Sequence, residues 1–241
     1  MAVYTFQSRV AYDDIDNDLK FTVKGAMRQM QEAAILDSGR SGYSVYDVKS
    51  KGRAWILVEW RVRLLDPVKW NDAIEVRTWP RAMDKLTCTR DFLIKGENGQ
   101  LAALGESVWV LVDIHTGHPV RLTEAVSNEF ELVEKQVFNG RRPKPASGTG
   151  ELASTYQVSC RDIDTNHHMN NRVYPEVARE ALPKEARDLE FPEVTVRYHR
   201  QLLEGEKVEC YYRYQDGTHI IDICEAGPKK RVSATVTFYE N

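Results

Sequence analysis

The segment RDIDTNHHMNN, residues 161–171, places Asp164, Asn166 and His168 at alternate positions just before an expected helix. If the backbone is extended there, alternate side chains share one face, so a carboxylate, an amide and an imidazole would meet. Imidazole can move a proton near neutral pH, carboxylate can orient it, and amide can donate to a developing oxyanion. The helix start would add backbone donors. This chemistry suits hydrolysis, although polar clusters before helices also serve as caps and turns.

An internal repeat provides a comparison for this segment. Residues 10–33 align without a gap to residues 158–181, and Asp16 falls on Asp164. At the same offset Asp18 stands opposite Asn166, and Lys20 stands opposite His168. The shared aspartate favours a turn or cap role, whereas the asparagine and the histidine are specific to the second copy. The repeat therefore predicts two ancestral sites, of which only the second is retained.

Each copy is expected to continue into a helix. In the first copy, apolar residues at three- and four-residue spacing end at a glycine stop: Val23, Met27, Met30, Ala34 and Gly39. In the second copy the stripe is Val173, Val177, Ala178 and Ala181, with Asn170 or Asn171 as N-cap, Pro175 in the first turn and Pro183 as terminator. His167 is expected to lie on the other side of the extended run, as a wall or surface residue.

Segments with strand character follow each helix. They alternate apolar and polar residues and are rich in β-branched and aromatic side chains. They cover residues 56–65, 73–80, 87–96 and 104–117, and then 193–203, 207–214, 218–226 and 231–241. The predicted fold class is α+β, with two units that are each a long helix wrapped by a curved antiparallel sheet. The expected boundaries are 1–137 for the N-terminal unit, 138–151 for a linker and 152–241 for the C-terminal unit.

Composition excludes several classes of protein. With 33 basic and 36 acidic side chains, the net charge of −3 gives no general attraction to nucleic acid. The four cysteines are widely spaced, which argues against a zinc site or a redox pair: Cys88, Cys160, Cys210 and Cys224. Because the sequence contains no apolar run of about 18 residues, we expect no membrane insertion. A cytoplasmic protein with reduced thiols is the expectation.

On these residues the chain resembles the bacterial branch of the acyl-acyl carrier protein (acyl-ACP) thioesterases, which are related to the plant fatty acyl-ACP thioesterases. The resemblance covers nearly the full length and rests on DIDTNHHMNN at 162–171, VRYHRQLL at 196–203 and the two-copy plan. It implies two tandem hotdog units and hydrolysis of the thioester between a fatty acyl chain and ACP. It also implies a place in fatty acid biosynthesis, without a metal or organic cofactor.

The resemblance also implies roles for individual residues. The family's aspartate, asparagine and histidine match Asp164, Asn166 and His168. Where plant members carry a glutamate and a cysteine, this chain has Gln201 and Leu202. Leucine cannot attack a thioester, so either water or the Asp164 carboxylate is the expected nucleophile. Gln201 can hold a water by hydrogen bonds, but it cannot act as a base.

Two further sets of residues follow from the resemblance. The family places the acyl chain in the first unit, where the lining candidates are Met27, Met30, Trp55 and Leu57. ACP is strongly acidic, so docking asks for exposed cations. The candidates are Lys229, Lys230 and Arg231, with Arg141, Arg142, Lys144, Arg197 and Arg200 as further possibilities. Whether two chains pair as a homodimer is left open by the sequence.

Three alternatives stay open at this point. A thioesterase that prefers coenzyme A esters would use the same chemistry on another carrier. A hydroxyacyl thioester dehydratase would need an acid on the helix that faces the histidine, and Glu176 and Glu180 are available there. A noncatalytic acyl-binding module would use the polar segment only as a turn.

Overall fold

The computed structural model describes residues 3–140, 145, 148 and 150–240. The chain divides into two compact units, residues 1–141 and 142–241, each with strands and helices of its own. Much of the expected linker, residues 141–144, 146–147 and 149, lies outside the described residues. The docking candidates Arg141, Arg142 and Lys144 lie there as well.

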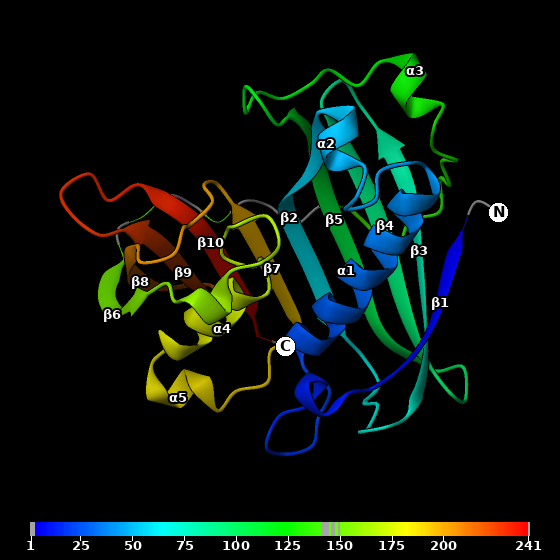
Figure 1. Cartoon of the computed structure of the whole chain (residues 1–241). Helices are drawn as coiled ribbons and strands as arrows, with labels where there is room; N and C mark the ends of the chain where they lie inside the picture. The colour runs from blue at the N-terminus through cyan, green and yellow to red at the C-terminus, as the bar shows by residue number, and fades with distance from the viewer. Residues whose placement is uncertain (1–2, 141–144, 146–147, 149, 241) are drawn as a thin grey trace. The chain divides into compact units, whose positions relative to one another are not determined.

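The N-terminal unit is a five-stranded antiparallel sheet with one long helix (Figure 1). Its elements are β1 (Tyr4–Arg9), η1 (Tyr12–Asp14), α1 (Val23–Arg40), α2 (Val48–Lys51), β2 (Arg53–Leu64), β3 (Ala73–Met83), β4 (Thr87–Gly96), β5 (Leu101–Asp113) and α3 (Glu124–Ser127). The strand order is β1-β3-β4-β5-β2. Every neighbouring pair in this order is antiparallel.

Helix α1 packs one apolar face against this sheet. Met27 and Met30 are fully buried, as the helical spacing predicts. Gly105 of β5 allows this close approach, because a Cβ there would lie 2.4 Å from Sδ of Met30. The helix runs past the expected stop at Gly39 and ends at the next residue, Arg40. The glycine that takes the left-handed conformation after the helix is Gly42, with φ 73°.

The C-terminal unit repeats the strand arrangement of the first. Its elements are β6 (Glu151–Gln157), η2 (Cys160–Asp162), α4 (Val173–Glu180), α5 (Lys184–Arg187), β7 (Glu193–Tyr198), β8 (Lys207–Gln215), β9 (Thr218–Glu225) and β10 (Val232–Tyr239). The order β7-β10-β9-β8-β6 corresponds strand for strand to β2-β5-β4-β3-β1. The internal repeat read from residues 10–33 and 158–181 therefore extends through both sheets.

The helix of the C-terminal unit is shorter than expected. Helix α1 has 18 residues, whereas α4 has 8 and is followed by the separate four-residue α5. Pro183 explains the break, because proline has no N–H group and disfavours helical backbone at the residue before it. Within the described residues, no helix is long and apolar enough to cross a membrane.

Candidate active site

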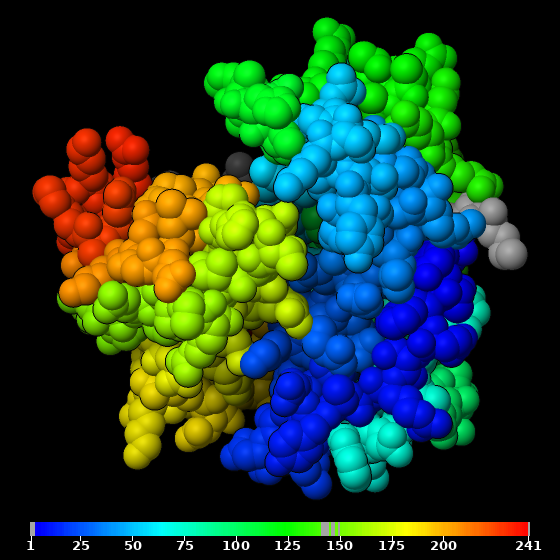
Figure 2. Space-filling view, in the orientation of Figure 1, coloured from blue at the N-terminus to red at the C-terminus, as the bar shows by residue number. Residues whose placement is uncertain are grey.

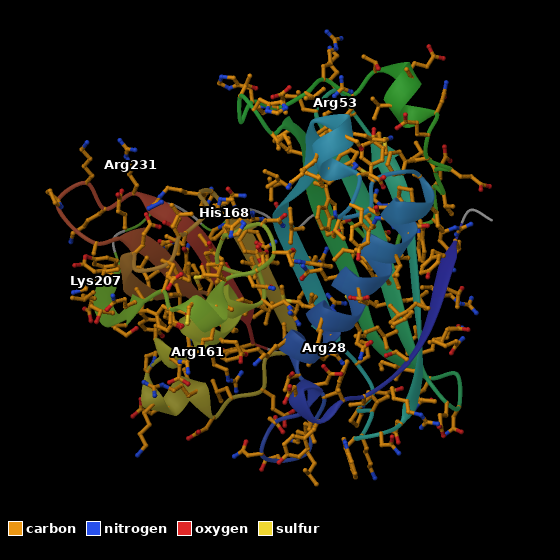
Figure 3. All side chains as sticks on the ribbon, in the orientation of Figure 1. Arg28, Arg53, Arg161, His168, Lys207 and Arg231 are labelled. Carbon is orange, nitrogen blue, oxygen red and sulfur yellow. The ribbon has the colours of Figure 1, made fainter. Side chains whose placement is uncertain are left out.

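Residues 164–168 form a closed turn between η2 and α4. The backbone N–H of Asp164 donates to the carbonyl oxygen of His168 at 2.9 Å, and that of His167 donates to Asp164 at 3.0 Å. Ile163 and Met169 pair as an antiparallel bridge at the base of the turn. His167 has a φ of 62°, a left-handed conformation that few residues other than glycine adopt. His168 follows it, on the loop that precedes α4 (Figure 3).

The expectation of an extended run with alternating faces was wrong. The Oδ1 atom of Asp164 accepts the backbone N–H of Asn166 at 2.8 Å, which folds the chain back on itself. Aspartate side chains commonly close turns in this way, by capping an amide two residues on. Asp164, Asn166 and His168 therefore share one small loop, and the proximity expected of them comes from turn geometry. Asn166 and His167 are both exposed there, while His168 is partly buried.

The first copy contains the same turn without the histidine. Asp16 donates its N–H to Lys20 at 2.9 Å, and its Oδ1 accepts the N–H of Asp18 at 3.0 Å. Leu19, the counterpart of His167, has a φ of 61°. The shared aspartate thus caps the turn in both units, while the residue that closes the turn is a lysine in one and a histidine in the other.

The imidazole of His168 has an unusual environment. Its Nδ1 atom is buried and has no hydrogen-bond partner among the described residues. The carboxylate of Asp164 therefore does not orient the ring through this nitrogen. Buried polar atoms without a partner are rare in folded proteins, and a chemical role is one of the reasons they occur.

A backbone hydrogen bond brings the Gln201 segment to this turn. The N–H of Met169 donates to the carbonyl oxygen of Leu202 at 2.8 Å. His168 and Gln201 each directly precede one of the two bonded residues. The side chain of Gln201 is exposed, whereas Leu202 is fully buried. The two segments that the sequence singled out are therefore neighbours in space.

The start of α4 differs from the prediction. Its N-cap is Arg172, and neither Asn170 nor Asn171 takes that position. Asn170 instead accepts the N–H of Arg172 on its side chain at 3.1 Å and that of Val173 on its carbonyl oxygen at 2.9 Å. Pro175, which lies in the first turn as expected, has no N–H group to offer. Few amides of this helix start are thus left to stabilise an oxyanion.

A glycine accounts for the difference between the two helix starts. In the first unit Thr22 caps α1 by accepting the N–H of Gly25 at 3.0 Å. A Cβ at Gly25 would lie only 2.6 Å from the carbonyl oxygen of Asp14. The matching residue in the second copy is Val173, whose side chain excludes so close an approach, and α4 begins there.

A buried carboxylate lies two residues before the capping aspartate of each turn. Asp162 accepts hydrogen bonds from the hydroxyls of Tyr156 and Ser159 and from the Ser159 N–H, at 2.7 to 2.8 Å. Burial opposes ionisation of Asp162, but these hydrogen bonds outweigh it and lower the pKa of the carboxyl. In the first unit Asp14 takes the same place and is bound by both Arg28 and Gln29.

The acyl-pocket candidates lie in the core of the N-terminal unit. Met27, Met30 and Leu57 are buried. Trp55 is partly buried, and its ring packs edge-on against Phe130 at 5.9 Å between centroids. None of the four lines the cavity of about 220 Å³ that the structure places in this unit. Their role in holding an acyl chain stays a prediction.

Residues 131–140, here called the strap, lie on the sheet of the N-terminal unit. Val133 donates its N–H to Pro80 at 3.0 Å, and Lys135 accepts the indole N–H of Trp79 at 2.7 Å. The ring of Phe138 lies 3.8 Å below the guanidinium of Arg61. Residues 138–140 belong to the expected linker, whereas Phe138 is buried in this unit.

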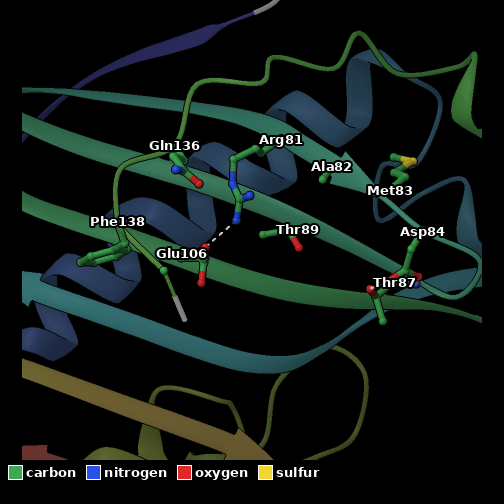
Figure 4. Close-up of a pocket in the computed structure, with 10 residues that line it drawn as sticks. Arg81, Ala82, Met83, Asp84, Thr87, Thr89, Glu106, Gln136 and Phe138 are labelled. Carbon is green, nitrogen blue, oxygen red and sulfur yellow. Dashed lines mark hydrogen bonds and ion pairs between the residues drawn. The ribbon is translucent and has the colours of Figure 1, made fainter. Parts of the chain in front are cut away.

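A buried polar cluster joins the strap to the sheet, and the sequence analysis did not identify it. Arg81 binds Asp91 at 3.2 Å and Glu106 at 2.6 Å, and the N–H of Val137 donates to Asp91 at 3.0 Å. Burial raises the pKa of Asp91 to about 6, even though Arg81 and the Val137 N–H favour its ionised form. Arg81 and Glu106 also line the cavity, beside Phe138 of the strap (Figure 4).

The basic docking candidates differ in exposure. Lys229, Lys230 and Arg231 are exposed in the turn between β9 and β10, which projects from the surface of its unit (red in Figure 2). Lys230 folds over the ring of Tyr211 at 4.7 Å. Arg197 lies on β7 and is only 7% exposed, so it was a wrong candidate for docking.

Arg200 forms an ion pair with the neighbouring Glu206. Its guanidinium donates to both carboxylate oxygens of Glu206, which reduces the charge that it can offer to a partner. Among the described residues, no three His, Cys, Asp or Glu side chains come together in a way that could hold a metal ion.

Known proteins resemble the chain in both sequence and structure. The family model for the acyl-ACP thioesterase N-terminal domain matches residues 1–130, and the model for the C-terminal domain matches residues 147–232. A chloroplastic palmitoyl-ACP thioesterase of Cuphea hookeriana is 24% identical in an alignment of 205 residues that covers 78% of this chain and 49% of the relative. A chloroplastic oleoyl-ACP thioesterase of Arabidopsis thaliana is 23% identical in an alignment of 168 residues that covers 64% of this chain and 46% of the relative. The chain thus spans about half the length of these curated relatives.

Two solved structures share the fold over nearly the whole chain. An acyl-ACP thioesterase from Bacteroides thetaiotaomicron superposes with a TM-score of 0.87 at 16% identity, covering 99% of this chain and 97% of that one. The 12:0-ACP thioesterase from Umbellularia californica gives a TM-score of 0.84 at 17% identity, with the same coverage. These similarities confirm the predicted α+β architecture of two hotdog units. Because the two family models together match most of its residues, the chain belongs to the acyl-ACP thioesterase family.

Proposed function

We propose that this protein hydrolyses the thioester between a fatty acyl chain and ACP, releasing free fatty acid and holo-ACP. Membership of the family supports the class of reaction. The observation that carries the assignment is His168, an imidazole added to a turn that the other unit builds without one. Since the turn forms equally well with Lys20, its backbone does not require a histidine.

The proposed roles follow from the chemistry of each side chain. His168 takes a proton from the attacking water and delivers it to the departing thiolate. The exposed side-chain amide of Asn166 polarises the thioester carbonyl, since its backbone N–H is already bonded to Asp164. A C–O bond forms, the C–S bond breaks, and the proton ends on the thiol of the carrier.

Asp164 and Gln201 complete the proposal. The capping bond to Asn166 uses one oxygen of the Asp164 carboxylate, and the other can activate water or attack the thioester. Gln201 holds the water through its exposed amide, on the segment that Leu202 fastens to the turn. In the route by direct attack, Asp164 forms an anhydride that water then hydrolyses.

Two alternative activities fit the geometry less well. A dehydratase would need Glu176 or Glu180 beside the imidazole, yet both are exposed on α4, whose buried face is formed by Tyr174, Pro175, Val177 and Ala178. A noncatalytic acyl-binding module would have no use for an imidazole that only one of two equivalent turns carries. A thioesterase that prefers coenzyme A esters shares the proposed chemistry and differs only in the carrier.

The test is release of free fatty acid and free carrier thiol from a panel of acyl-ACPs. We expect His168→Ala to lower kcat by about a hundredfold or more, because general acid-base catalysis contributes on this scale. The matched control is Lys20→Ala, which makes the same truncation in the equivalent turn and should leave kcat unchanged. An enoyl thioester as product would identify a dehydratase. Equal rates of hydrolysis of acyl-CoA and acyl-ACP would show that the enzyme does not select ACP as the carrier.

Partner and pocket belong to the same proposal. We place the ACP contact at the exposed turn of Lys229, Lys230 and Arg231, and the acyl chain beside Met27, Met30, Trp55 and Leu57. Charge complementarity supports the docking turn, since the carrier is acidic. A cytoplasmic location and a homodimer stay predictions.

A further inference from the structure

The hydroxyl of Tyr156 connects the turn of His168 to strand β6. It donates to Oδ2 of Asp162 at 2.7 Å, and the N–H and hydroxyl of Ser159 donate to the same oxygen at 2.8 Å. Asp162 is only 6% exposed, so water competes poorly for these bonds. Arg161 lies 3.9 Å from the other carboxylate oxygen, but its side chain is 84% exposed, which makes this ion pair weak. Of these partners, Tyr156 is the one that lies on a strand.

Asp162 holds both ends of the turn. Its backbone carbonyl oxygen accepts the N–H of Asn170 at 2.8 Å. Ile163 and Met169 pair directly inside that bond, and the turn closes between them. A hydrogen bond to the Asp162 side chain therefore fixes the base of the loop that carries His168.

The first unit fixes the equivalent carboxylate in a different way. At the offset of the internal repeat Tyr156 matches Ser8, whose shorter side chain bonds the next backbone carbonyl instead. Asp14, the buried carboxylate of this unit, is bound from helix α1, by Arg28 at 2.6 Å and by Gln29 at 2.9 Å. The first unit thus ties its turn to the helix.

Helix α4 is poorly suited to the same task. At the two matching positions the second copy has Glu176 and Val177. Glu176 carries the same charge as Asp162, and the Val177 side chain has no hydrogen-bonding group. Helix α4 has 8 residues against 18 in α1, and its N-cap makes no side-chain hydrogen bond. Because a short helix without a cap is weakly held at its start, strand β6 is the firmer support.

We infer that Tyr156 is a positioning residue, whose hydroxyl fixes the turn of His168 to the sheet through Asp162. The inference rests on the proposed hydrolysis for its effect on rate. Tyr156 acts through the carboxylate and not on the substrate, and it keeps the imidazole where it can reach the attacking water. Both units form the same turn, so the hydroxyl is not needed to fold it. Without the hydroxyl, His168 would keep its chemistry and lose its fixed place.

The first experiment compares Tyr156→Phe with Tyr212→Phe. Both tyrosines are partly buried in the C-terminal unit and bond another side chain, since the Tyr212 hydroxyl lies 3.1 Å from Nδ1 of His219. Both variants should lower the melting temperature by a few degrees. We expect Tyr156→Phe to lower kcat about tenfold, with KM for acyl-ACP changed by less than about twofold, because misplacement of a catalytic group acts on the chemical step.

Tyr212→Phe should keep kcat within about twofold of the wild type, because its hydroxyl does not contact the turn or Asp162. Equal kcat losses in the two variants would show a general loss of stability and overturn the inference. An unchanged kcat in Tyr156→Phe would overturn it as well.

The second experiment combines Tyr156→Phe with Asp162→Ala. If the tyrosine acts through this carboxylate, the double variant should be no more than about twofold slower than Asp162→Ala alone. Multiplication of the two separate losses would mean that Tyr156 acts by another route, and it would sink the inference.

Amide hydrogen exchange tests the positioning role with the conservative variant alone and without turnover. Tyr156→Phe should speed exchange of the Asn170 N–H, which bonds Asp162, by at least about tenfold, while Tyr212→Phe should leave it near the wild-type rate. A wild type that releases no fatty acid from acyl-ACP would refute the proposed function alone. An Asn170 amide that exchanges equally fast in the wild type and in Tyr156→Phe would refute the positioning role.

Discussion

At the scale of single residues, the same aspartate caps the turn in both units, and a chemical role is proposed for it only in the second unit. Asp16 and Asp164 both cap an amide two residues on, so the carboxylate is explained structurally in each unit. Only Asp164 shares its turn with a histidine. An aspartate in this position is therefore weak evidence for catalysis by itself, and the proposed chemistry of Asp164 has to be tested apart from its capping role.

Two substitutions of Asp164 separate the effect of its capping oxygen from the effect of its charge. Asp164→Asn keeps an oxygen that can accept the Asn166 N–H but removes the charge, so we expect an unchanged melting temperature and a kcat about a hundredfold lower. Asp164→Ala should also lose about 1 kcal/mol of stability, as a lost cap usually does. The measurements are kcat on acyl-ACP and thermal unfolding.

The first unit supplies the matched controls. Asp16→Ala should cost at least as much stability as Asp164→Ala, because Oδ1 of Asp16 accepts the N–H of Lys20 at 2.9 Å as well as that of Asp18, and it should leave kcat unchanged. Full activity in Asp164→Asn would show that Asp164 is only a cap and that His168 works without a carboxylate.

At the scale of elements, a buried titratable group fastens the strap to the sheet. Asp91 is 0% exposed and accepts the Val137 N–H of the strap, while Arg81 and Glu106 face it from β3 and β5. Because its folded pKa of about 6 lies above its ordinary value of 3.8, folding favours the protonated form. The stability that this contributes is fully present below about pH 4 and is lost as the pH rises through about 6.

Asp91→Asn should remove this pH dependence. Between pH 4 and pH 7, the free energy of unfolding of the wild type should fall relative to that of the variant, by an amount on the order of 3 kcal/mol. Denaturant unfolding at several pH values measures the difference. A wild type that instead gains stability over the variant across this range would show that pairing with Arg81 outweighs burial, and that the pKa lies below 3.8.

At the scale of the whole molecule, the proposed recognition of an acidic carrier would depend on exposed charges that the fold does not require. Lys229→Glu with Arg231→Glu reverses two exposed charges and leaves Lys230, which packs over Tyr211, in place. We expect KM for acyl-ACP to rise about tenfold at low salt and its salt dependence to weaken, because screening acts on exposed charges. KM for acyl-CoA should not change.

The control for this surface lies on the same unit. Lys184→Glu reverses an exposed charge on α5 and should leave KM for both substrates unchanged. If the double reversal at 229 and 231 has no effect on KM for acyl-ACP, the carrier docks elsewhere.

The sequence by itself determined the two-copy plan and the strands, because alternation of apolar and polar residues is a local property that each sheet repeats. Segment 87–96 became β4 with the expected ends, and 73–80 became the larger part of β3. It also singled out His168, since comparing one copy with the other needs no coordinates, whereas Gln201 was named only through the resemblance to the plant enzymes.

Only the tertiary structure decided how these residues meet. The turn at 164–168 depends on the hydrogen bond from the Asn166 N–H to the Asp164 side chain, and the later start of α4 depends on the space that the Val173 side chain needs. Neither feature shows in the periodicity of the sequence. The Asp91 cluster joins residues far apart in the chain, so no local pattern reports it. Local spacing fixes which face a residue occupies, whereas the partner across that face is set by packing of the whole unit.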